Sequence, residues 1–146
     1  MSTVNDLPKN VAFWFDEEFL GKLTEGYKQA FGSTLGAVPF TLIIHVESPK
    51  RGIKDAAIQF DFVSKQLRYT LLEREEPDKP KNGALISGKP EAWQGAYDKR
   101  SFIAIKGLDV KYHITQSKNE DKIKNTVTGF FAAAIRVAQE FNYLPS

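Results

Sequence analysis

The segment from Ser117 to Phe141, SKNEDKIKNTVTGFFAAAIRVAQEF, decides the fold because it predicts one long amphipathic helix. Ser117 and Glu120 have the spacing of a capping box, which places the start of this helix near Lys118. Its apolar residues recur at intervals of three and four and therefore share one helical face; they are Ile123, Val127, Phe130, Phe131, Ala134, Ile135, Ala138 and Phe141. The rest of the chain must supply an apolar surface for this face.

The composition is that of a globular protein with many aromatic residues. Of the 146 residues, 42% are hydrophobic and 26% are charged. This length predicts a single domain over residues 1–146, with residues 1–10 as a flexible arm. The chain contains eleven Phe, five Tyr and two Trp. Such residues either fill a bulky core or line an apolar cavity, and composition leaves both possibilities open.

Other features of the composition argue against several functions. The chain has no cysteine, which excludes thiolate chemistry, and we expect neither a metal nor a cofactor. The net charge of +2 comes from interspersed basic and acidic residues, so we expect no nucleic-acid partner. No stretch is apolar enough for stable membrane insertion, and the N-terminus lacks a signal-peptide pattern, so we expect a cytoplasmic protein.

The sequence before the long helix predicts the elements that cover it. Val11–Phe15 fits either a strand or the lead-in to a helix, and Asp16 has the position of an N-cap for a helix that ends near Phe31. A shorter helix is expected to start at Pro90. Alternating apolar and polar residues predict strands at 40–47, 53–63, 67–74, 84–87, 101–106 and 110–116. Together they predict an α+β fold, with an antiparallel sheet of five to six strands covered on one face by helices.

Residues with catalytic chemistry are few. His45 and His113 are the only imidazoles, and both fit the polar sides of strands without a catalytic role. Asp16, Glu17 and Glu18 lie at a predicted helix start, where the macrodipole favours carboxylates. The sequence contains no phosphate-binding loop, nucleophile elbow or metal-ligand spacing. We therefore assign no catalytic residue.

The remaining candidate site is apolar. Gly129 and Ala134 are small residues of the long helix, and they leave room beneath it if the surrounding rings do not close tightly. Six aromatic side chains from three predicted elements are expected to converge there: Phe60, Phe62, Trp93, Tyr97, Phe130 and Phe131. The residues alone do not decide between a filled core and a pocket.

Two segments, Ile86–Trp93 (ISGKPEAW) and Phe102–Asp109 (FIAIKGLD), resemble the sterol carrier protein family. In that family a strand leads into a helix through a similar Pro-Glu-Ala-Trp turn. The resemblance implies an α+β sandwich with a five-stranded sheet and a hydrophobic tunnel for sterols, fatty acyl chains or acyl-CoA. It also implies that Trp93, Phe102 and Ile105 line this tunnel.

Two alternatives stay open beside this resemblance. A helix-grip fold of the START kind also holds a long C-terminal helix against a curved antiparallel sheet. It would admit a small cavity enzyme of cyclase or hydrolase type, with Tyr69, His113 or His45 as acid or base. The second alternative is an interaction subunit whose aromatic residues are all core.

We favour a non-enzymatic carrier that binds a hydrophobic small molecule and presents it to an enzyme partner, either alone or as a homodimer. Its mechanism would be desolvation of the ligand in an apolar cavity beneath the long helix. The expected ligand-binding residues are Phe60, Phe62, Trp93, Tyr97, Phe102, Ile105, Gly129, Phe130, Phe131 and Ala134.

Overall fold

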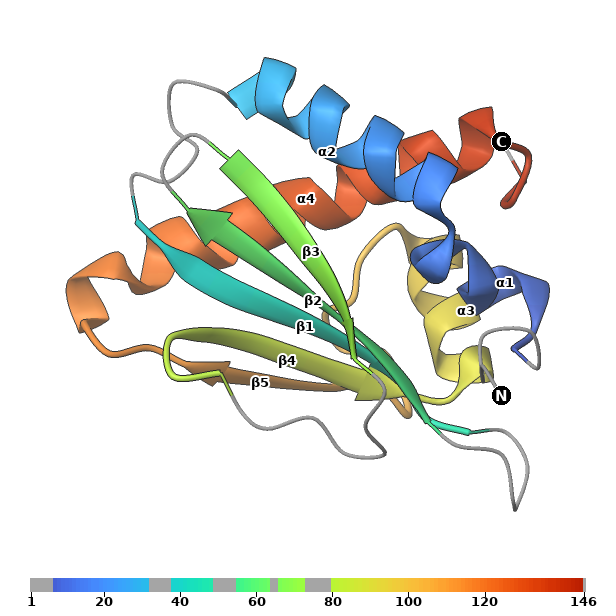
Figure 1. Cartoon of the computed structure of the whole chain (residues 1–146). Helices are drawn as coiled ribbons and strands as arrows, with labels where there is room; N and C mark the ends of the chain where they lie inside the picture. Colours follow the sequence, from blue (N-terminus) through green and yellow to red (C-terminus); the bar gives the residue numbers. More distant parts are fainter. Residues whose placement is uncertain (1–6, 32–37, 49–54, 64–65, 73–79, 146) are drawn as a thin grey trace.

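The protein is described by a computed structural model over residues 7–31, 38–48, 55–63, 66–72 and 80–145 (Figure 1). The α+β class and the long C-terminal helix are confirmed. In chain order the elements are α1 (Lys9–Ala12), η2 (Phe13–Phe15), α2 (Glu17–Phe31), β1 (Phe40–Val46), β2 (Ala56–Val63), β3 (Gln66–Leu72), β4 (Gly83–Gly88), α3 (Pro90–Lys99), β5 (Asp109–His113), η3 (Ser117–Asn119) and α4 (Glu120–Glu140). The two elements labelled η are 3₁₀ helices.

The five strands form one sheet in the order β3-β2-β1-β4-β5. Three of the neighbouring pairs are antiparallel, but β1 and β4 run parallel. The prediction of an antiparallel sheet was therefore wrong at this pair. Strand β4 pairs with the edge of β1 that β2 leaves open, and there it runs in the direction of β1. Alternation of apolar residues is the same for both pairings, so it could not distinguish them.

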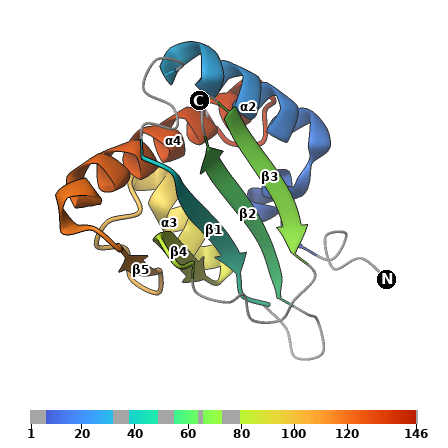
Figure 2. The same cartoon turned by 60° about the vertical axis from the view of Figure 1, so that its left-hand side comes forward.

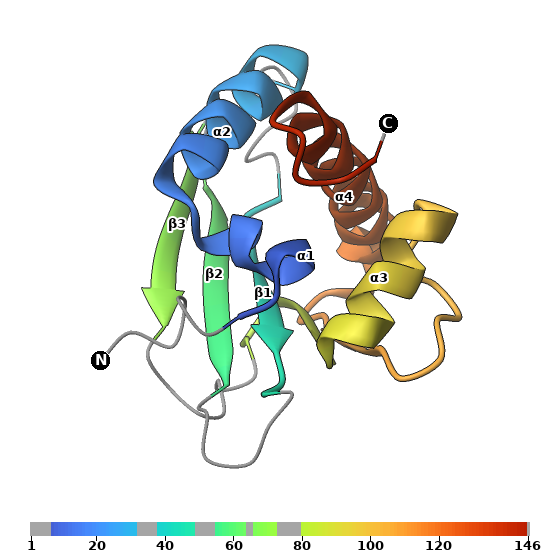
Figure 3. The ribbon, with the colours of Figure 1, turned by 90° about the vertical axis from the view of Figure 1, so that its right-hand side faces the viewer.

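Helices α2, α3 and α4 lie on one side of the sheet, as predicted (Figure 3). Figure 2 shows the opposite face, in front of which no described helix lies. The strand residues that point toward the helices are apolar and mostly buried, as in Phe40, Leu42 and Ile44 of β1. The core thus lies between the sheet and a single layer of helices.

The predicted helix starts were partly correct. Asp16 is the N-cap of α2, because its Oδ2 accepts the backbone N–H of Phe19 at 3.3 Å, and Pro90 is the first residue of α3. The capping box at Ser117 was wrong. Ser117–Asn119 forms the 3₁₀ turn η3, and α4 begins at Glu120 with no side-chain cap. A short turn thus precedes the long helix.

The predicted strand at 101–106 was also wrong. The segment is a loop with turns, and Ala104 within it has a positive φ angle (57°) that a strand does not accommodate. Gly107, directly after it, also has a positive φ angle (86°). Phe102 and Ile105 nevertheless point into the core, whereas Ile103 is 63% exposed. The apolar alternation therefore reflected a loop that anchors two side chains.

The ambiguous segment Val11–Phe15 is helical, divided between α1 and η2. Most of the predicted arm, residues 1–6, lies outside the described residues. Within the rest, Leu7 is buried and the Asn10 Nδ2 donates to the backbone oxygen of Pro90 at 2.9 Å. Figure 3 shows α1 between α3 and the strands β1 and β2. The N-terminal segment is therefore part of the helical layer.

Candidate functional site

A continuous layer of aromatic rings fills the space between the sheet and α4. At one end, Phe130 lies 5.3 Å from both Tyr27 and Phe62 in edge-to-face geometry, and Phe40 stacks on Phe62 at 4.3 Å. Phe60 continues the layer, since its ring lies 4.8 Å from that of Phe130. Such contacts add to the free energy of simple area burial.

The other end of the layer is built around Phe131 of α4. Its ring contacts those of Trp93, Tyr97 and Phe102, at centroid distances of 6.4, 6.2 and 5.4 Å. All of these side chains are buried. The structure thus brings together, in two connected groups, the six aromatic residues that the sequence placed beneath the helix, and it adds Phe102.

The three smaller members of the expected set take different places. Ala134 is fully buried in α4, and Ile105 is 8% exposed in the loop before β5. Gly129 is only half-buried. The described aromatic rings are in contact with each other, so in this structure the expected residues form a packed layer.

Trp14 of η2 is the central residue of this layer that the sequence did not assign. Its indole is fully buried and contacts Phe60, Trp93 and Phe131 at centroid distances of 6.2, 6.1 and 6.4 Å. The indole N–H donates to the Tyr97 hydroxyl at 2.8 Å. The run of three aromatic residues at 13–15 was the sequence feature that could have indicated a buried ring here. Because that segment fits both a strand and a helix, the sequence did not show in which direction the Trp14 side chain points.

Tyr97 connects this buried end to the surface. Burial raises the pKa of its phenol, so the hydroxyl stays neutral through the physiological range. Tyr97 also lines a hollow of about 160 Å³ between α3 and the end of α4. The other residues that line it are Gln94, Asp98, Arg100, Ile135, Gln139, Leu144 and Pro145. The hollow provides a polar surface next to the apolar layer.

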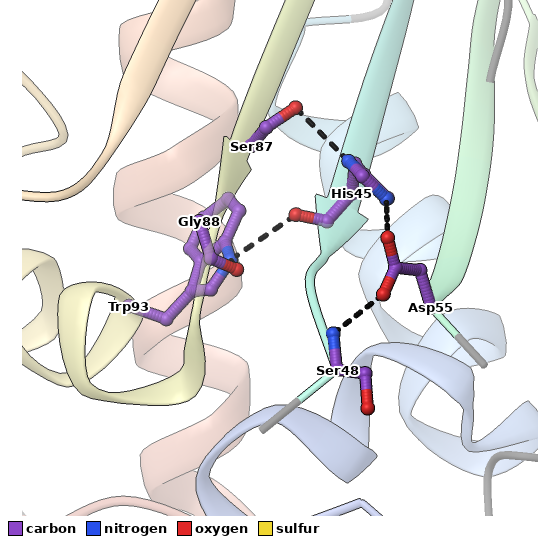
Figure 4. A network of polar contacts seen from close by, with 6 residues as sticks. All are labelled: His45, Ser48, Asp55, Ser87, Gly88 and Trp93. Atoms are coloured by element: carbon purple, nitrogen blue, oxygen red, sulfur yellow. Dashed lines mark hydrogen bonds and ion pairs between the residues drawn. The ribbon is translucent and has the colours of Figure 1, made fainter. Parts of the chain in front are cut away.

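A polar network occupies the opposite face of the sheet, where β1, β4 and the start of β2 meet (Figure 4). His45 is 6% exposed and uses both ring nitrogens: Nδ1 lies 3.1 Å from Ser87 Oγ and Nε2 lies 3.1 Å from Asp55 Oδ2. Asp55 Oδ1 accepts the backbone N–H of Ser48 at 2.6 Å. Since a carboxylate only accepts, the Nε2–H donates to Asp55, and in a neutral imidazole Nδ1 then accepts from the Ser87 hydroxyl.

Trp93 joins this network to the aromatic layer. Its indole N–H lies 3.1 Å from the backbone oxygen of Gly88 and 3.4 Å from that of His45. Trp93 therefore has a polar role at the end of β4 as well as a packing role. Its hydrogen bonds fix the ring against which Trp14 packs.

The acid and base candidates of the enzyme alternative do not form one site. Tyr69 lies on β3 and His113 on β5, which are the two edges of the sheet, and both are exposed. His45 lies on the central strand β1. Within the described ranges, no group of three or more acidic or imidazole side chains could hold a metal ion.

A separate groove of about 400 Å³ lies on the sheet near the start of β1. It is lined by Pro39, Phe40, Thr41, Ile43, Gln59, Val63, Pro80, Lys81 and Asn82. None of these is among the expected ligand-binding residues. As to membranes, the described helices include none with the length and apolar character needed for a span.

Comparison with known proteins supports the predicted fold. No family model matches the sequence, and no curated protein matches it. Two solved structures do. The crystal structure of sterol carrier protein 2 aligns with a TM-score of 0.55 and 19% identity, over 82% of this chain and 92% of that chain. The solution structure of a conserved hypothetical protein from Thermus thermophilus, described as "possibly sterol carrier protein", aligns with a TM-score of 0.53 and 20% identity, over 90% of this chain and 92% of that chain. The chain is therefore similar in fold to sterol carrier proteins, as its motifs predicted.

Proposed function

We propose that the protein binds a hydrophobic small molecule between the sheet and helices α3 and α4. The observation that carries this proposal is the aromatic layer, which gathers rings from η2, α2, α3, β1 and β2 beneath α4. Transfer of an apolar molecule from water to such a surface is favourable in proportion to the apolar area removed from water. The similarity in fold to proteins named as sterol carriers supports the same function.

The expected ligand is a sterol, a fatty acyl chain or a related molecule, which the protein would carry and present to a partner. Phe60, Trp93, Tyr97 and Phe131 are the proposed contacts, because they surround Trp14 at the end of the layer next to the hollow. The rings at the other end, around Phe62, would then support the site by packing.

The experiment that tests this function begins with native mass spectrometry of the freshly purified protein, followed by solvent extraction. An extracted lipid would identify the ligand class. The protein freed of lipid is then titrated with oleic acid and cholesterol in a calorimeter. We expect saturable binding of at least one, weakened about tenfold or more by Phe131→Ala, since roughly 1.4 kcal/mol of lost contact suffices for that factor.

Thr70→Ala is the matched control, because Thr70 is exposed on the sheet face opposite to the helices. It should bind as the original protein does. An apo mass together with no binding of either probe would reject carriage and favour the interaction subunit.

A second candidate function follows from the contacts of His45. In the order Ser87, His45, Asp55, the network places a hydroxyl, a base and an orienting carboxylate at hydrogen-bond distances. This order would allow hydrolysis of an ester. Ser87 Oγ would attack the carbonyl carbon while His45 Nδ1 accepts the hydroxyl proton. Nδ1 would then give this proton to the alcohol, which leaves. Water then cleaves the acyl-serine.

A test of this candidate is labelling with a fluorophosphonate and turnover of 4-nitrophenyl acetate. Hydrolysis at Ser87 requires that Ser87→Ala abolish both signals and that His45→Gln abolish turnover. Absence of labelling in the unmodified protein would leave the network with a structural role only.

A further inference from the structure

The side chain of Trp14 has the position and the chemistry of a bound ligand. It is a flat apolar group, fully buried, and surrounded by residues of β2, α3 and α4. Its single polar atom makes a hydrogen bond to the Tyr97 hydroxyl at 2.8 Å. Apolar sites for small molecules have this composition, with a few placed polar groups that fix orientation.

We propose that the space filled by Trp14 is the ligand site, that its ligand is a neutral apolar molecule with one hydrogen-bond donor, and that the N-terminal segment 7–15 is its built-in competitor. This inference rests on the proposed function and names its ligand class and its regulation. The donor of the ligand replaces the indole N–H at Tyr97. The apolar body replaces the indole ring against Trp93 and Phe131.

The neutral character of the ligand follows from the surroundings of Trp14. The rings that contact it belong to Phe13, Phe19, Phe60, Trp93 and Phe131. Burial raises the pKa of Tyr97, which therefore offers a neutral oxygen and not a phenolate. A charged headgroup in this space would lose its hydration without an ionic partner among these residues.

Departure of the N-terminal segment would expose Val11, Phe13 and Phe15 together with Trp14, but it would leave the start of the neighbouring helix capped. Helix α2 has its own cap, because Asp16 accepts the N–H of Phe19 through its side chain. Residues before Asp16 belong to two short elements, of four and three residues. Besides the backbone bond from the Asp16 N–H to the Phe13 oxygen, their described polar links to the rest of the protein are side-chain bonds from Asn10 to Pro90 and from Trp14 to Tyr97.

The hollow beside Tyr97 gives the route of entry. It lies between α3 and the C-terminal end of α4, and Tyr97 forms part of its wall. The Tyr97 hydroxyl itself is buried, so a ligand that approaches from this side reaches it as Trp14 withdraws. The ligand therefore competes directly with Trp14. Only molecules in which Trp14 has left the site can bind, so the apparent affinity for the ligand falls in proportion to their fraction.

The decisive experiment uses Trp14 as its own reporter. The sequence has two tryptophans, and Trp93 is itself a proposed ligand contact, so it is left in place. The emission of the original protein is compared with that of Trp14→Phe, and the difference between the two spectra gives the emission of Trp14. The probe is decan-1-ol, with 1-methoxydecane as the matched molecule that lacks the donor. We expect decan-1-ol to shift the Trp14 emission to longer wavelength in step with calorimetric binding, and 1-methoxydecane to bind about fivefold less well, which corresponds to one lost hydrogen bond.

A second variant removes the competitor. Trp14→Ala should bind decan-1-ol about tenfold or more tightly than the original protein, because the inserted state no longer exists. Adding Tyr97→Phe should abolish the preference for the alcohol over the ether. Phe40→Ala is the control, since it removes a buried ring at the other end of the layer and should produce no gain.

The outcomes separate this inference from the proposed function. Calorimetric binding of decan-1-ol with unchanged Trp14 emission overturns the inference, and so does equal affinity in the Trp14→Ala protein, while carriage itself stands. Gain of binding in Trp14→Ala without any binding of oleic acid or cholesterol supports the inference and rejects carriage of those lipids. If Trp14→Ala does not fold, the emission test alone decides.

Discussion

On the sheet face beneath α4 the buried side chains are apolar rings, whereas on the opposite face His45 is buried within a set of hydrogen bonds. Burial of rings is non-directional, so one apolar group can replace another of similar shape. The contacts of His45 are directional, because each nitrogen requires a partner of the correct kind at the correct place. Packing on the first face therefore depends on shape and apolar area, while the second face joins β1, β4 and the start of β2 through matched partners.

The largest effect is expected on the helix-covered face. Phe131→Ala removes a ring that contacts Trp14, Trp93, Tyr97 and Phe102, and should lower the free energy of unfolding by about 3–5 kcal/mol. Urea denaturation measures this loss. Phe131→Leu, which keeps most of the volume, should cost clearly less. Equal losses for both variants would mean that ring geometry, and not filled volume, stabilises this face.

On the opposite face the effect should depend on matched partners. His45→Ala leaves Ser87 and Asp55 without their shared partner and should cost about 1–3 kcal/mol. A double-mutant cycle with Asp55→Asn isolates the pair, and we expect a coupling energy of about 0.5–3 kcal/mol. Additive losses in urea denaturation would show that the two side chains stabilise the sheet independently. We do not expect this result, because His45 Nε2 lies 3.1 Å from Asp55 Oδ2.

Alkaline pH should distinguish the faces in another way. Burial raises the pKa values of Tyr27 and Tyr97 on the helix-covered face. Below the unfolded-state value of about 10 both states keep the proton, so this contribution to stability is complete. Above it only the unfolded state loses the proton, and stability falls with rising pH by up to about 1.4 kcal/mol per pH unit for each group.

Tyr97→Phe tests this assignment, because it removes one of the tyrosines whose pKa is raised by burial. Above about pH 10 the free energy of unfolding should then fall less steeply with pH, by up to about 1.4 kcal/mol per pH unit, which is the contribution of one tyrosine. Urea denaturation at a series of alkaline pH values measures it. An unchanged slope would mean that Tyr97 is already hydrated in the folded state.

Local sequence patterns predicted most elements because each depends on neighbours along the chain. The N-cap Asp16, the start of α3 at Pro90 and the amphipathic face of α4 are examples. The parallel pairing of β1 with β4 is not local, because it depends on which sheet edge a later strand reaches. The turn at 101–106 was misjudged for a related reason: alternating apolar residues also occur where a loop anchors separate side chains.

The candidate site shows the same limit. Its rings on β2, α3 and α4 could be assigned from the periodicity of their own elements. Trp14 could not, because a five-residue apolar run fits a strand and a helix equally and so gives no direction for its side chains. Likewise, Ser87 and Asp55 became partners of His45 only through strand pairing.

The smallest expected effect concerns Tyr143, which joins the C-terminal end of the chain to the N-terminal segment. The Tyr143 hydroxyl donates to Asp16 Oδ2 at 2.7 Å, and the Tyr143 ring stacks on Phe13 at 6.1 Å. Tyr143→Phe keeps the ring and removes only a solvent-exposed bond, so it should cost less than about 1 kcal/mol. Asp16→Ala removes this bond and also the cap of α2, which adds about 0.5–2 kcal/mol. Urea denaturation of both variants measures the difference, and equal losses would show that the cap contributes nothing to stability.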